Sequence, residues 1–336
     1  MSAMANQRPN VPLTLAINDS DQVRDLVSGR VAVDGVDLTC LLYPVEEIFF
    51  RFTKFREWEV SEMSLGKFTA LRSRGDTSII GLPVFPSRSF RHSGIFVRAD
   101  GPVDDPAALA GARIGIPEWT VTATVYQRGL LEHEYGIPLH EVSWVQAGIN
   151  SPGRVETLPV GLPPGVEIDQ RPDATLNDLL LAGEIDAMLV PHPPRSFEDR
   201  SGEIVQLFSE PRRVEREYFQ RTGVFPIMHL IVLRADAFAA HPWIAMNFLK
   251  AFGEAKDRSL SRLRDATAPH FPLPWGPERA KEDEQIFGAD LWPYGIEANR
   301  TTLETFLGFA LEQGLLEREL AVDDLFPDEV REAFRI

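Results

Sequence analysis

Short apolar runs alternate with helical patterns along the first quarter of the chain. Residues 13–17, 59–64 and 78–82 predict strands. Apolar side chains recur at helical spacing over 44–55, and 65–74 follows its strand directly as a second helix. Strands that alternate with helices are typical of an α/β protein with a largely parallel sheet.

The same alternation continues through the middle of the chain. Residues 111–117 open a new α/β unit with a short strand, and a helix is predicted over 125–135. Further strands are expected at 142–145 and 184–190. Residues 147–170 are rich in glycine and proline, which predicts a lid-like loop.

The last third of the chain returns to a strand and then becomes helical. Residues 227–233 predict a strand, and 238–263 read as one helix with Pro242 in its first turn. A proline-rich break is expected at 268–277, and an amphipathic helix at 301–313.

The order of these elements predicts two lobes rather than one. A chain of 336 residues is long enough for two cores, and connections between them are expected near 98–106 and 220–227. Residues 1–98 and 225–336 would form lobe 1, and 99–224 would form lobe 2. This layout resembles the hinged α/β fold of type II periplasmic binding proteins, whose ligand lies in the cleft between lobes.

The net charge narrows the choice of partner. Lys and Arg number 34 against 50 Asp and Glu, which gives a net charge of −16. Nucleic acids and anionic membranes require a basic face, so neither is expected as a partner. The single cysteine, Cys40, excludes an internal disulfide and a cysteine-rich zinc site. The first twelve residues contain no apolar segment typical of a signal peptide, and no apolar run is long enough to span a bilayer, so we expect a cytoplasmic protein.

Two prolines mark the end of the strand predicted at 78–82. Pro83 and Pro86 cannot donate hydrogen bonds to a sheet, so the chain is expected to turn out of the sheet there. A polar, basic loop and a second strand, 94–98, follow.

The loop after these prolines carries three candidates for binding an anion. Arg88, Arg91 and His92 lie within five residues of one another, in a chain that is acidic overall. Arginine is the side chain best suited to bidentate recognition of a carboxylate. The alternative is that these arginines are solvated or pair with nearby acids.

Two predicted helix starts offer further contacts. Ser64 precedes the helix at 65–74 and is a candidate cap, and the amides of that helix start could meet an anion. Trp119 and Thr120 precede the helix at 125–135, which provides a second plausible contact to an anion or an aryl ring.

Several motifs are similar to those of the 4,5-dihydroxyphthalate decarboxylase family, and the resemblance runs from about residue 13 to about residue 327. It is carried by residues 62–65, 85–93, 225–229, 241–243 and 292–300. The resemblance implies non-oxidative loss of one carboxyl group from a dihydroxylated aromatic dicarboxylate, giving 3,4-dihydroxybenzoate. The stretch 147–170 matches the family least well.

The chemistry implied by the resemblance suggests roles for the candidates. Loss of CO2 from an aromatic ring needs an acid near the ring carbon, a base near a hydroxyl and cations for the remaining carboxylate. Arg88 and Arg91 would clamp that carboxylate. His92 or His229 would donate the proton, and Glu62 would accept from a ring hydroxyl or orient a histidine.

Aromatic and hydroxyl side chains would complete the site. The expected substrate-binding residues besides the two arginines are Phe85, Ser64, Trp119, Thr120, Trp292 and Tyr294. Packing in the core is the alternative for Trp292 and Tyr294 and for His229, which stands in an apolar strand.

The sequence leaves the need for a metal and the exact function undecided. No cofactor is predicted, although Glu62, His92 and His229 are residue types that bind divalent metals. No local metal-binding spacing is present in the sequence. The expected partners are a small aromatic carboxylate and further copies of the chain. The alternatives are a solute-binding protein for an aromatic acid, or a lyase of the same scaffold that acts on another hydroxylated aromatic acid.

Overall fold

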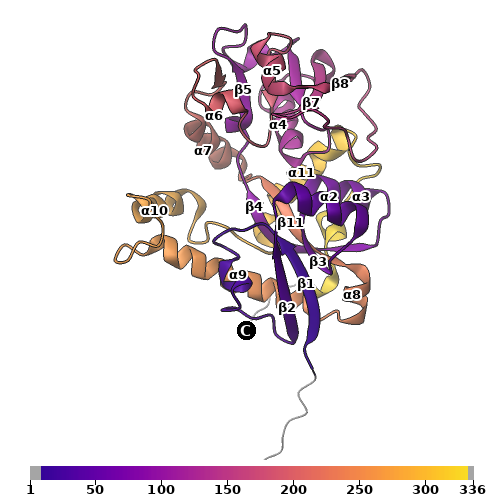
Figure 1. Ribbon diagram of the computed structural model, residues 1–336, viewed down its shortest axis with the longest axis vertical. Coiled ribbons are helices and arrows are strands. Elements are labelled where there is room, and N and C mark those ends of the chain that lie inside the picture. The colour runs from indigo at the N-terminus through magenta and orange to yellow at the C-terminus, as the bar shows by residue number, and fades with distance from the viewer. Residues whose placement is uncertain (1–8, 332–336) are drawn as a thin grey trace, which may run out of the picture.

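A computed structural model describes residues 9–331, which form two β-sheets flanked by helices (Figure 1). The first sheet has the strand order β2-β1-β3-β11-β4. Its strands are β1 (Val11–Ile17), β2 (Val36–Leu42), β3 (Val60–Ser64), β4 (Ile79–Arg88) and β11 (Ile227–Arg234). β1 is parallel to β2 and β3, whereas β11 is antiparallel to β3 and β4. The first sheet is therefore built from two distant parts of the chain.

The second sheet has the strand order β10-β5-β9-β6-β7-β8. Its strands are β5 (Ile95–Arg98), β6 (Arg113–Ile116), β7 (Ser143–Gly148), β8 (Ile168–Thr175), β9 (Ala187–Leu189) and β10 (Ile204–Gln206). β6 to β9 run parallel, and β5 is antiparallel to both of its neighbours. The division between sheets falls between β4 and β5, a few residues before the predicted boundary at 98. The assignment of whole segments to two lobes stays a prediction.

β4 differs from the expected strand because it continues past the two prolines to Arg88. The pairing with β11 skips there: Ile231 lies opposite Leu82, and His229 lies opposite Ser87. The intervening residues therefore bulge out of the ladder, which relieves Pro83 and Pro86 of the need to donate hydrogen bonds. The expectation that the strand ends at Pro83 was wrong, because the bulge lets the strand continue although Pro83 and Pro86 cannot donate hydrogen bonds to the sheet.

Helices cover both sheets. They are α1 (Arg24–Val27), α2 (Val45–Phe55), α3 (Leu65–Ser73), α4 (Thr122–His133), α5 (Leu176–Leu181), α6 (Arg195–Glu198), α7 (Pro211–Thr222), α8 (Ala235–Ala240), α9 (Ile244–Arg264), α10 (Gly276–Phe287) and α11 (Arg300–Glu312). None of the helices between residues 9 and 331 is long and apolar enough to cross a bilayer.

The helical C-terminal region departs from the sequence prediction in two places. The single helix expected over 238–263 is two helices, α8 and α9, which separate at 241–243 around Pro242. α10 begins inside the expected proline-rich break and was not predicted. Its Pro277 is tolerated because the first turn of a helix needs no amide donor there.

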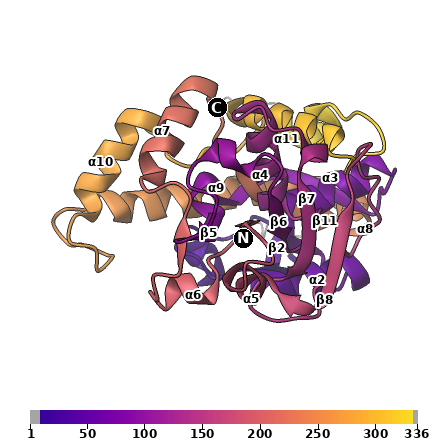
Figure 2. The same ribbon diagram turned by 90° about the horizontal axis from the view of Figure 1, so that it is seen from above.

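The two sheets are joined by a continuous buried core. One cluster of apolar side chains includes Leu15 and Ile231 of the first sheet as well as Ile114 and Trp144 of the second. The C-terminal segment strengthens this connection, because Arg128 Nε on α4 donates to Gln313 Oε1, just after α11, at 2.9 Å. In Figures 1 and 2, α11 lies close to α4.

Candidate active site

Glu62 and His229 form a hydrogen-bonded pair in the first sheet. β3 and β11 are neighbours, and the pairing of His229 with Ser64 places Glu62 diagonally across on the same face. Nδ1 of His229 lies 2.6 Å from Oε1 of Glu62. The other carboxylate oxygen of Glu62 accepts from the backbone N–H of Asn18 at 2.9 Å. The carboxylate is thus held between the imidazole of His229 on β11 and a backbone N–H just after β1.

This arrangement leaves Nε2 of His229 without a hydrogen-bond partner among residues 9–331. A carboxylate bound at Nδ1 fixes the orientation of the imidazole and directs Nε2 elsewhere. The side chain of His229 is 17% exposed, whereas that of Glu62 is 3% exposed. The ring of Phe49 on α2 meets the imidazole edge-on, with 4.8 Å between centroids. The pair is therefore an oriented histidine with limited solvent access.

Close to this pair, the starts of α3 and α4 touch each other. Ser64 caps α3, and its Oγ lies 2.9 Å from Oγ1 of Thr122, the first residue of α4. The same Thr122 oxygen accepts from the N–H of Gly66 at 2.9 Å. These bonds connect the helix that follows β3 of one sheet to the helix that follows β6 of the other. The expected cap role of Ser64 is confirmed by its contact with the N–H of Lys67.

The amides expected near Trp119 and Thr120 already have an anionic partner within the chain. Oε2 of Glu156 accepts from the N–H of Trp119 at 2.6 Å and from the N–H of Thr120 at 3.2 Å. The Thr120 hydroxyl also donates to Glu156. Glu156 belongs to the loop 149–167, which corresponds to the predicted excursion. A protein carboxylate therefore occupies the place that the sequence suggested for a ligand anion.

Arg88 is buried and surrounded by neutral acceptors. It is 6% exposed, and its guanidinium donates to the carbonyls of Phe225 (3.1 Å) and Pro293 (2.8 Å) and to the Asn299 side chain. Its Nε has no hydrogen-bond partner in the described part of the chain. Burial lowers the pKa of Arg88 to about 10, so it remains charged at neutral pH.

Arg91 is also a buried cation whose hydrogen bonds go to neutral atoms. Nη1 donates to the carbonyl of Pro191 at 3.0 Å, and Nε contacts Sδ of Met228 at 3.0 Å. Burial lowers its pKa to about 10, and the charge of Glu215 opposes that shift. Neither Arg88 nor Arg91 forms an ion pair with a described acid.

His92 lies in an aromatic environment rather than beside the Glu62–His229 pair. It is 2% exposed, its ring meets Phe208 and Tyr218 edge-on, and its Nδ1 has no partner among residues 9–331. Burial lowers the pKa of His92 to about 4, because a charged imidazole would lose its hydration there. His92 is therefore a neutral side chain at physiological pH.

Two of the four aromatic candidates are core residues. Phe85 and Trp119 are fully buried, and the Arg128 guanidinium lies 3.8 Å from the centroid of the Trp119 ring. Trp292 and Tyr294 are partly buried; Trp292 Nε1 donates to the Phe85 carbonyl at 2.8 Å. The Tyr294 hydroxyl donates to Gln22 at 3.3 Å, and burial raises the pKa of Tyr294.

Sequence reasoning missed two contributors to the site, Asn18 and Phe49. Asn18 directly follows β1, and the carboxyl ends of the parallel strands β1 and β3 meet at one edge of the sheet. Ligands of open α/β sheets bind at such edges, so this signal was present in the sequence. The sequence placed Phe49 in a predicted helix, but the helical pattern does not show which side of that helix faces His229.

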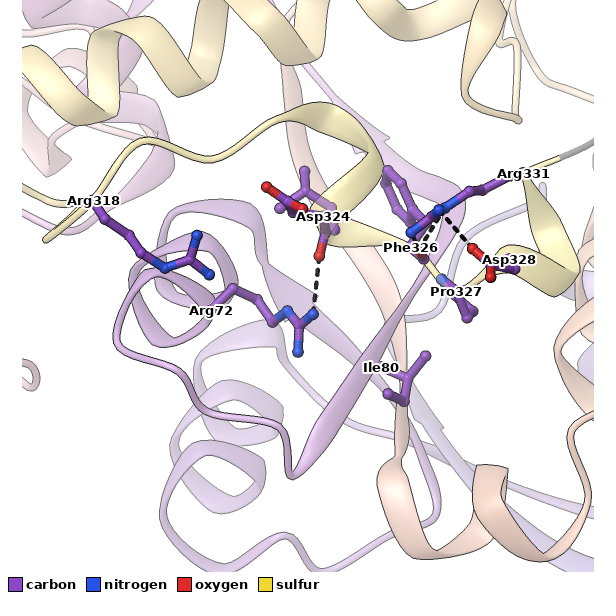
Figure 3. A pocket seen from close by; sticks show the side chains of 9 residues that line it. Arg72, Ile80, Arg318, Asp324, Phe326, Pro327, Asp328 and Arg331 are labelled. Atoms are coloured by element: carbon purple, nitrogen blue, oxygen red, sulfur yellow. Dashed lines mark hydrogen bonds and ion pairs between the residues drawn. The ribbon is translucent and has the colours of Figure 1, made fainter.

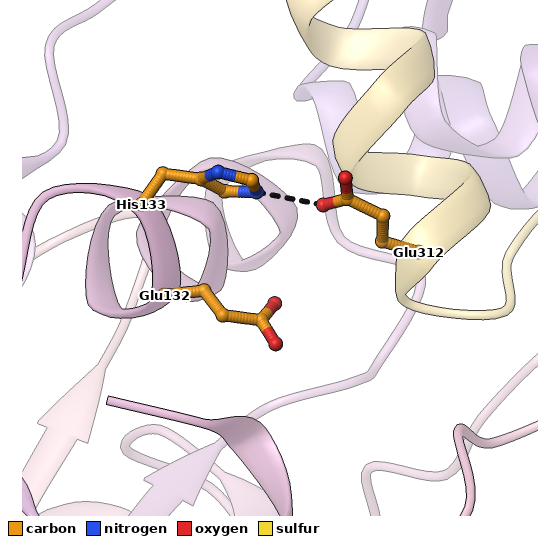
Figure 4. Close-up of side chains that lie close together, drawn as sticks. All are labelled: Glu132, His133 and Glu312. Carbon is orange, nitrogen blue, oxygen red and sulfur yellow. Dashed lines mark hydrogen bonds and ion pairs between the residues drawn. The ribbon is translucent and has the colours of Figure 1, made fainter. Parts of the chain in front are cut away.

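A possible metal-binding group lies elsewhere on the surface. Glu132 and His133 of α4 lie near Glu312 of α11, with potential ligand atoms within 4.8 Å of one another (Figure 4). Nε2 of His133 is 2.7 Å from Oε2 of Glu312, which links the two helices. Burial, with repulsion from Glu312, raises the pKa of Glu132. Among the described residues this is the one grouping of three such side chains, and it excludes Glu62, His92 and His229.

A cavity of about 330 Å³ lies at the C-terminal segment (Figure 3). Its arginines bind the chain itself: Arg72 Nη2 donates to the Asp324 carbonyl at 2.9 Å, and Arg331 pairs with Asp328 at 2.5 Å. The Arg72 contact fastens the segment after α11 to α3, so we assign this cavity a structural role.

Two curated relatives share much of this sequence. A 4,5-dihydroxyphthalate decarboxylase from Comamonas testosteroni is 36% identical over 325 residues, which cover 96% of this chain and 98% of the relative. A second protein of that name, from Pseudomonas putida, is 35% identical over 209 residues, covering 62% of this chain and 81% of the relative. No family model matches the chain.

Solved structures confirm the expected fold. The aliphatic sulphonate binding protein SsuA from Escherichia coli superimposes with a TM-score of 0.53 at 10% identity, over 96% of this chain and 99% of SsuA. A protein from Candida albicans, described as having the generic periplasmic binding protein fold, gives 0.52 at 12% identity, over 98% of this chain and 99% of that protein. The chain therefore has the α/β fold of periplasmic binding proteins.

Proposed function

Because this chain belongs to the family of 4,5-dihydroxyphthalate decarboxylases, we propose that it converts 4,5-dihydroxyphthalate to 3,4-dihydroxybenzoate and CO2. The observation that supports the mechanism is the Glu62–His229 pair, in which a carboxylate fixes Nδ1 and no described residue binds Nε2. A histidine oriented in this way is suited to general acid catalysis.

The substrate supplies the electrons that the reaction needs. Each carboxylate of 4,5-dihydroxyphthalate is para to a hydroxyl group, which pushes electron density toward the ring carbon that bears that carboxylate. A proton added to this carbon gives a dearomatised intermediate. The carbon–carboxylate bond then breaks, its electron pair restores the aromatic ring, and CO2 leaves.

His229 is the proton donor in this proposal. The protonated imidazole gives its Nε2 proton to the ring carbon, and Glu62 stabilises the imidazolium through Nδ1 before the transfer. The neutral imidazole then takes a proton back from solvent, so one proton is consumed per turnover. Glu62 therefore acts by orienting and stabilising His229, which is the second of the two roles that the sequence suggested.

Buried positive charge supports an anionic substrate. Arg88 and Arg91 are buried cations that form no ion pair with a described acid, and the full chain carries a net charge of −16. A buried charge is costly unless an opposite charge compensates it, and a substrate carboxylate could do so. We therefore assign the attraction of the remaining carboxylate to Arg91.

The test compares two histidines in metal-stripped protein. We expect His229→Gln to lower kcat by about 10²- to 10⁴-fold, the usual contribution of a general acid. His92→Phe should keep most of the turnover, because His92 is neutral and enclosed by aromatic rings. Release of CO2 and formation of 3,4-dihydroxybenzoate are followed by chromatography at pH 7.5.

The outcomes separate the candidate functions. Loss of turnover in His92→Phe, with His229→Gln active, would reverse the assignment of the two histidines. Saturable binding without turnover, even after divalent metal is restored, would favour a solute-binding protein for an aromatic acid. Turnover of a different hydroxylated acid in a substrate panel would favour another lyase on this scaffold.

We also propose, as the sequence suggested, that the protein works in the cytoplasm and forms a homo-oligomer. Its proposed substrate is a small aromatic carboxylate, and the acidic chain does not favour nucleic acids or anionic membranes. Cell fractionation and light scattering of the purified protein test these two points.

A further inference from the structure

A groove of about 790 Å³ lies between α7 and α10, and its lining residues take no part in the proposed proton transfer. The two helices lie side by side in Figure 2, although α7 follows the second sheet and α10 comes after the return to the first. We call this cavity the α7–α10 groove and define it by the aromatic side chains Phe90, Phe225 and Phe287 and the cations Arg88, Arg212 and Arg216.

The groove is locally positive in an acidic protein. Five arginines and three acids line it, whereas the whole chain has a net charge of −16. Two acids are already paired: Glu210 lies 3.2 Å from Arg213, and Asp283 lies 3.1 Å from Arg279. The third acid, Glu215, accepts from a backbone N–H at 2.9 Å, and burial raises its pKa.

Two arginines of the groove remain free to bind a ligand. Arg212 and Arg216 are exposed residues of α7, and neither forms an ion pair or hydrogen bond with a described residue. They are four positions apart, so both project from the same side of the helix. A planar guanidinium fork is well matched to a carboxylate.

Arg88 provides a buried donor at the inner end of the groove. Its side chain is almost completely buried, and its Nε–H has no partner among the described residues. A buried donor without a partner costs free energy, which a ligand oxygen would recover. Arg88 also packs against the Phe225 ring, with 5.3 Å between the guanidinium carbon and the ring centroid.

The floor of the groove is a set of aromatic rings. Phe90 and Phe225 stack at 4.9 Å with an angle of 21° between their planes, and Phe287 lies 5.2 Å from Phe225. Flat aromatic ligands pack well against such rings. The floor therefore selects for a planar apolar body, and the arginines select for a negative group.

We propose that the α7–α10 groove is a second ligand site, separate from the Glu62–His229 pair, and that it binds an aromatic carboxylate. The ring of the ligand lies on the phenylalanine floor, and its carboxylate is held by Arg212 and Arg216, with the Nε–H of Arg88 as an inner donor. This site does not depend on the proposed decarboxylation, because none of the groove residues that define it takes part in the proton transfer.

Calorimetry with phthalate tests the proposal, because phthalate has the two carboxylates but lacks the hydroxyl groups that the reaction needs. We expect two binding events per wild-type chain, one in each site. In the double variant R212A/R216A the groove event should weaken by about tenfold for each charge-assisted hydrogen bond that the substitutions remove. A control double variant, R171A/R258A, removes two arginines that form ion pairs elsewhere, with Glu184 and Glu254, and should retain both events.

Each other result would overturn the proposal. One event in all three proteins would mean that the groove binds nothing, and two events that survive in R212A/R216A would place the second site elsewhere. Equal binding of cyclohexanecarboxylate or inorganic phosphate at the second site would refute the aromatic class. Turnover of wild-type protein is measured separately, so its absence would count against the decarboxylase proposal and leave this one standing.

Discussion

Two histidines of similar appearance in the sequence have opposite surroundings in the fold. His229 faces a carboxylate and retains some exposure, whereas His92 is enclosed by aromatic rings without a described partner for Nδ1. The sequence showed that both were candidates, because each stands in a motif shared with the family. It could not rank them, because a bulge in β4 and the packing of α7 decide what each ring meets.

The low pKa of His92 predicts a loss of stability in mild acid. Its folded-state pKa of about 4 lies below the ordinary value of 6.5, so the unfolded chain binds more protons between these values. The free energy of unfolding therefore falls as the pH drops from 6.5 toward 4, by about 2 kcal/mol from this group at pH 5. Urea unfolding of wild type and His92→Phe at pH 7.5 and pH 5 measures this change in the free energy of unfolding.

The variant should lose less stability between these pH values, since phenylalanine does not titrate. An equal loss in both proteins would show that other groups cause the acid sensitivity.

At the scale of elements, the junction of α3 and α4 depends on a glycine. A Cβ added at Gly66 would lie 2.6 Å from the carbonyl oxygen of Thr120, which is backbone and cannot move aside easily. We expect Gly66→Ala to separate the two helix starts, raise KM severalfold and lower the free energy of unfolding by about 1–3 kcal/mol. Steady-state kinetics and urea unfolding provide the measurements.

A second glycine gives the matched control for this variant. Gly253 lies within α9, and a Cβ there would meet no atom within 4 Å. Gly253→Ala should therefore be neutral or stabilise the protein by up to about 1 kcal/mol, through helix propensity alone. Similar destabilisation by both substitutions would argue against the helix contact as the cause.

The loop 149–167 is held by Glu156, which suggests a test of its mobility. Glu156→Gln keeps one acceptor but puts an NH2 group against the N–H groups of Trp119 and Thr120. We expect faster hydrogen exchange at these two amides, by about tenfold for the removal of one charge-assisted hydrogen bond. Glu167→Gln removes the same charge from an exposed position of this loop and should leave the exchange unchanged.

Most elements followed from local sequence, and the failures have physical causes. The strand at 13–17 and the helix at 44–55 were found because their apolar periodicity is strong. α10 was missed because its proline and glycine, which signal a break, occupy first-turn positions where both are tolerated. The anion cradle at Thr120 was foreseen, but a partner some 36 residues later in the chain, Glu156, cannot be read from local patterns.

At the scale of the whole molecule, the site and the groove both depend on segments that are distant in sequence. The Glu62–His229 contact joins residues separated by 167 positions. Such contacts leave no local signature, so only resemblance to relatives pointed to these residues together. One buried apolar core contains side chains from both sheets, so the two sheets pack together.

The central place of β11 has a consequence for how the protein is made. β11 lies between β3 and β4, yet all six strands of the second sheet are synthesised before it. During translation, β4 therefore leaves the ribosome before its neighbour β11, whereas the strands of the second sheet have all been made by then. Domains that emerge complete tend to fold first. The inserted part should thus fold while the ribosome is still working, and His229, the proposed proton donor, should enter its site only as β11 closes the first sheet.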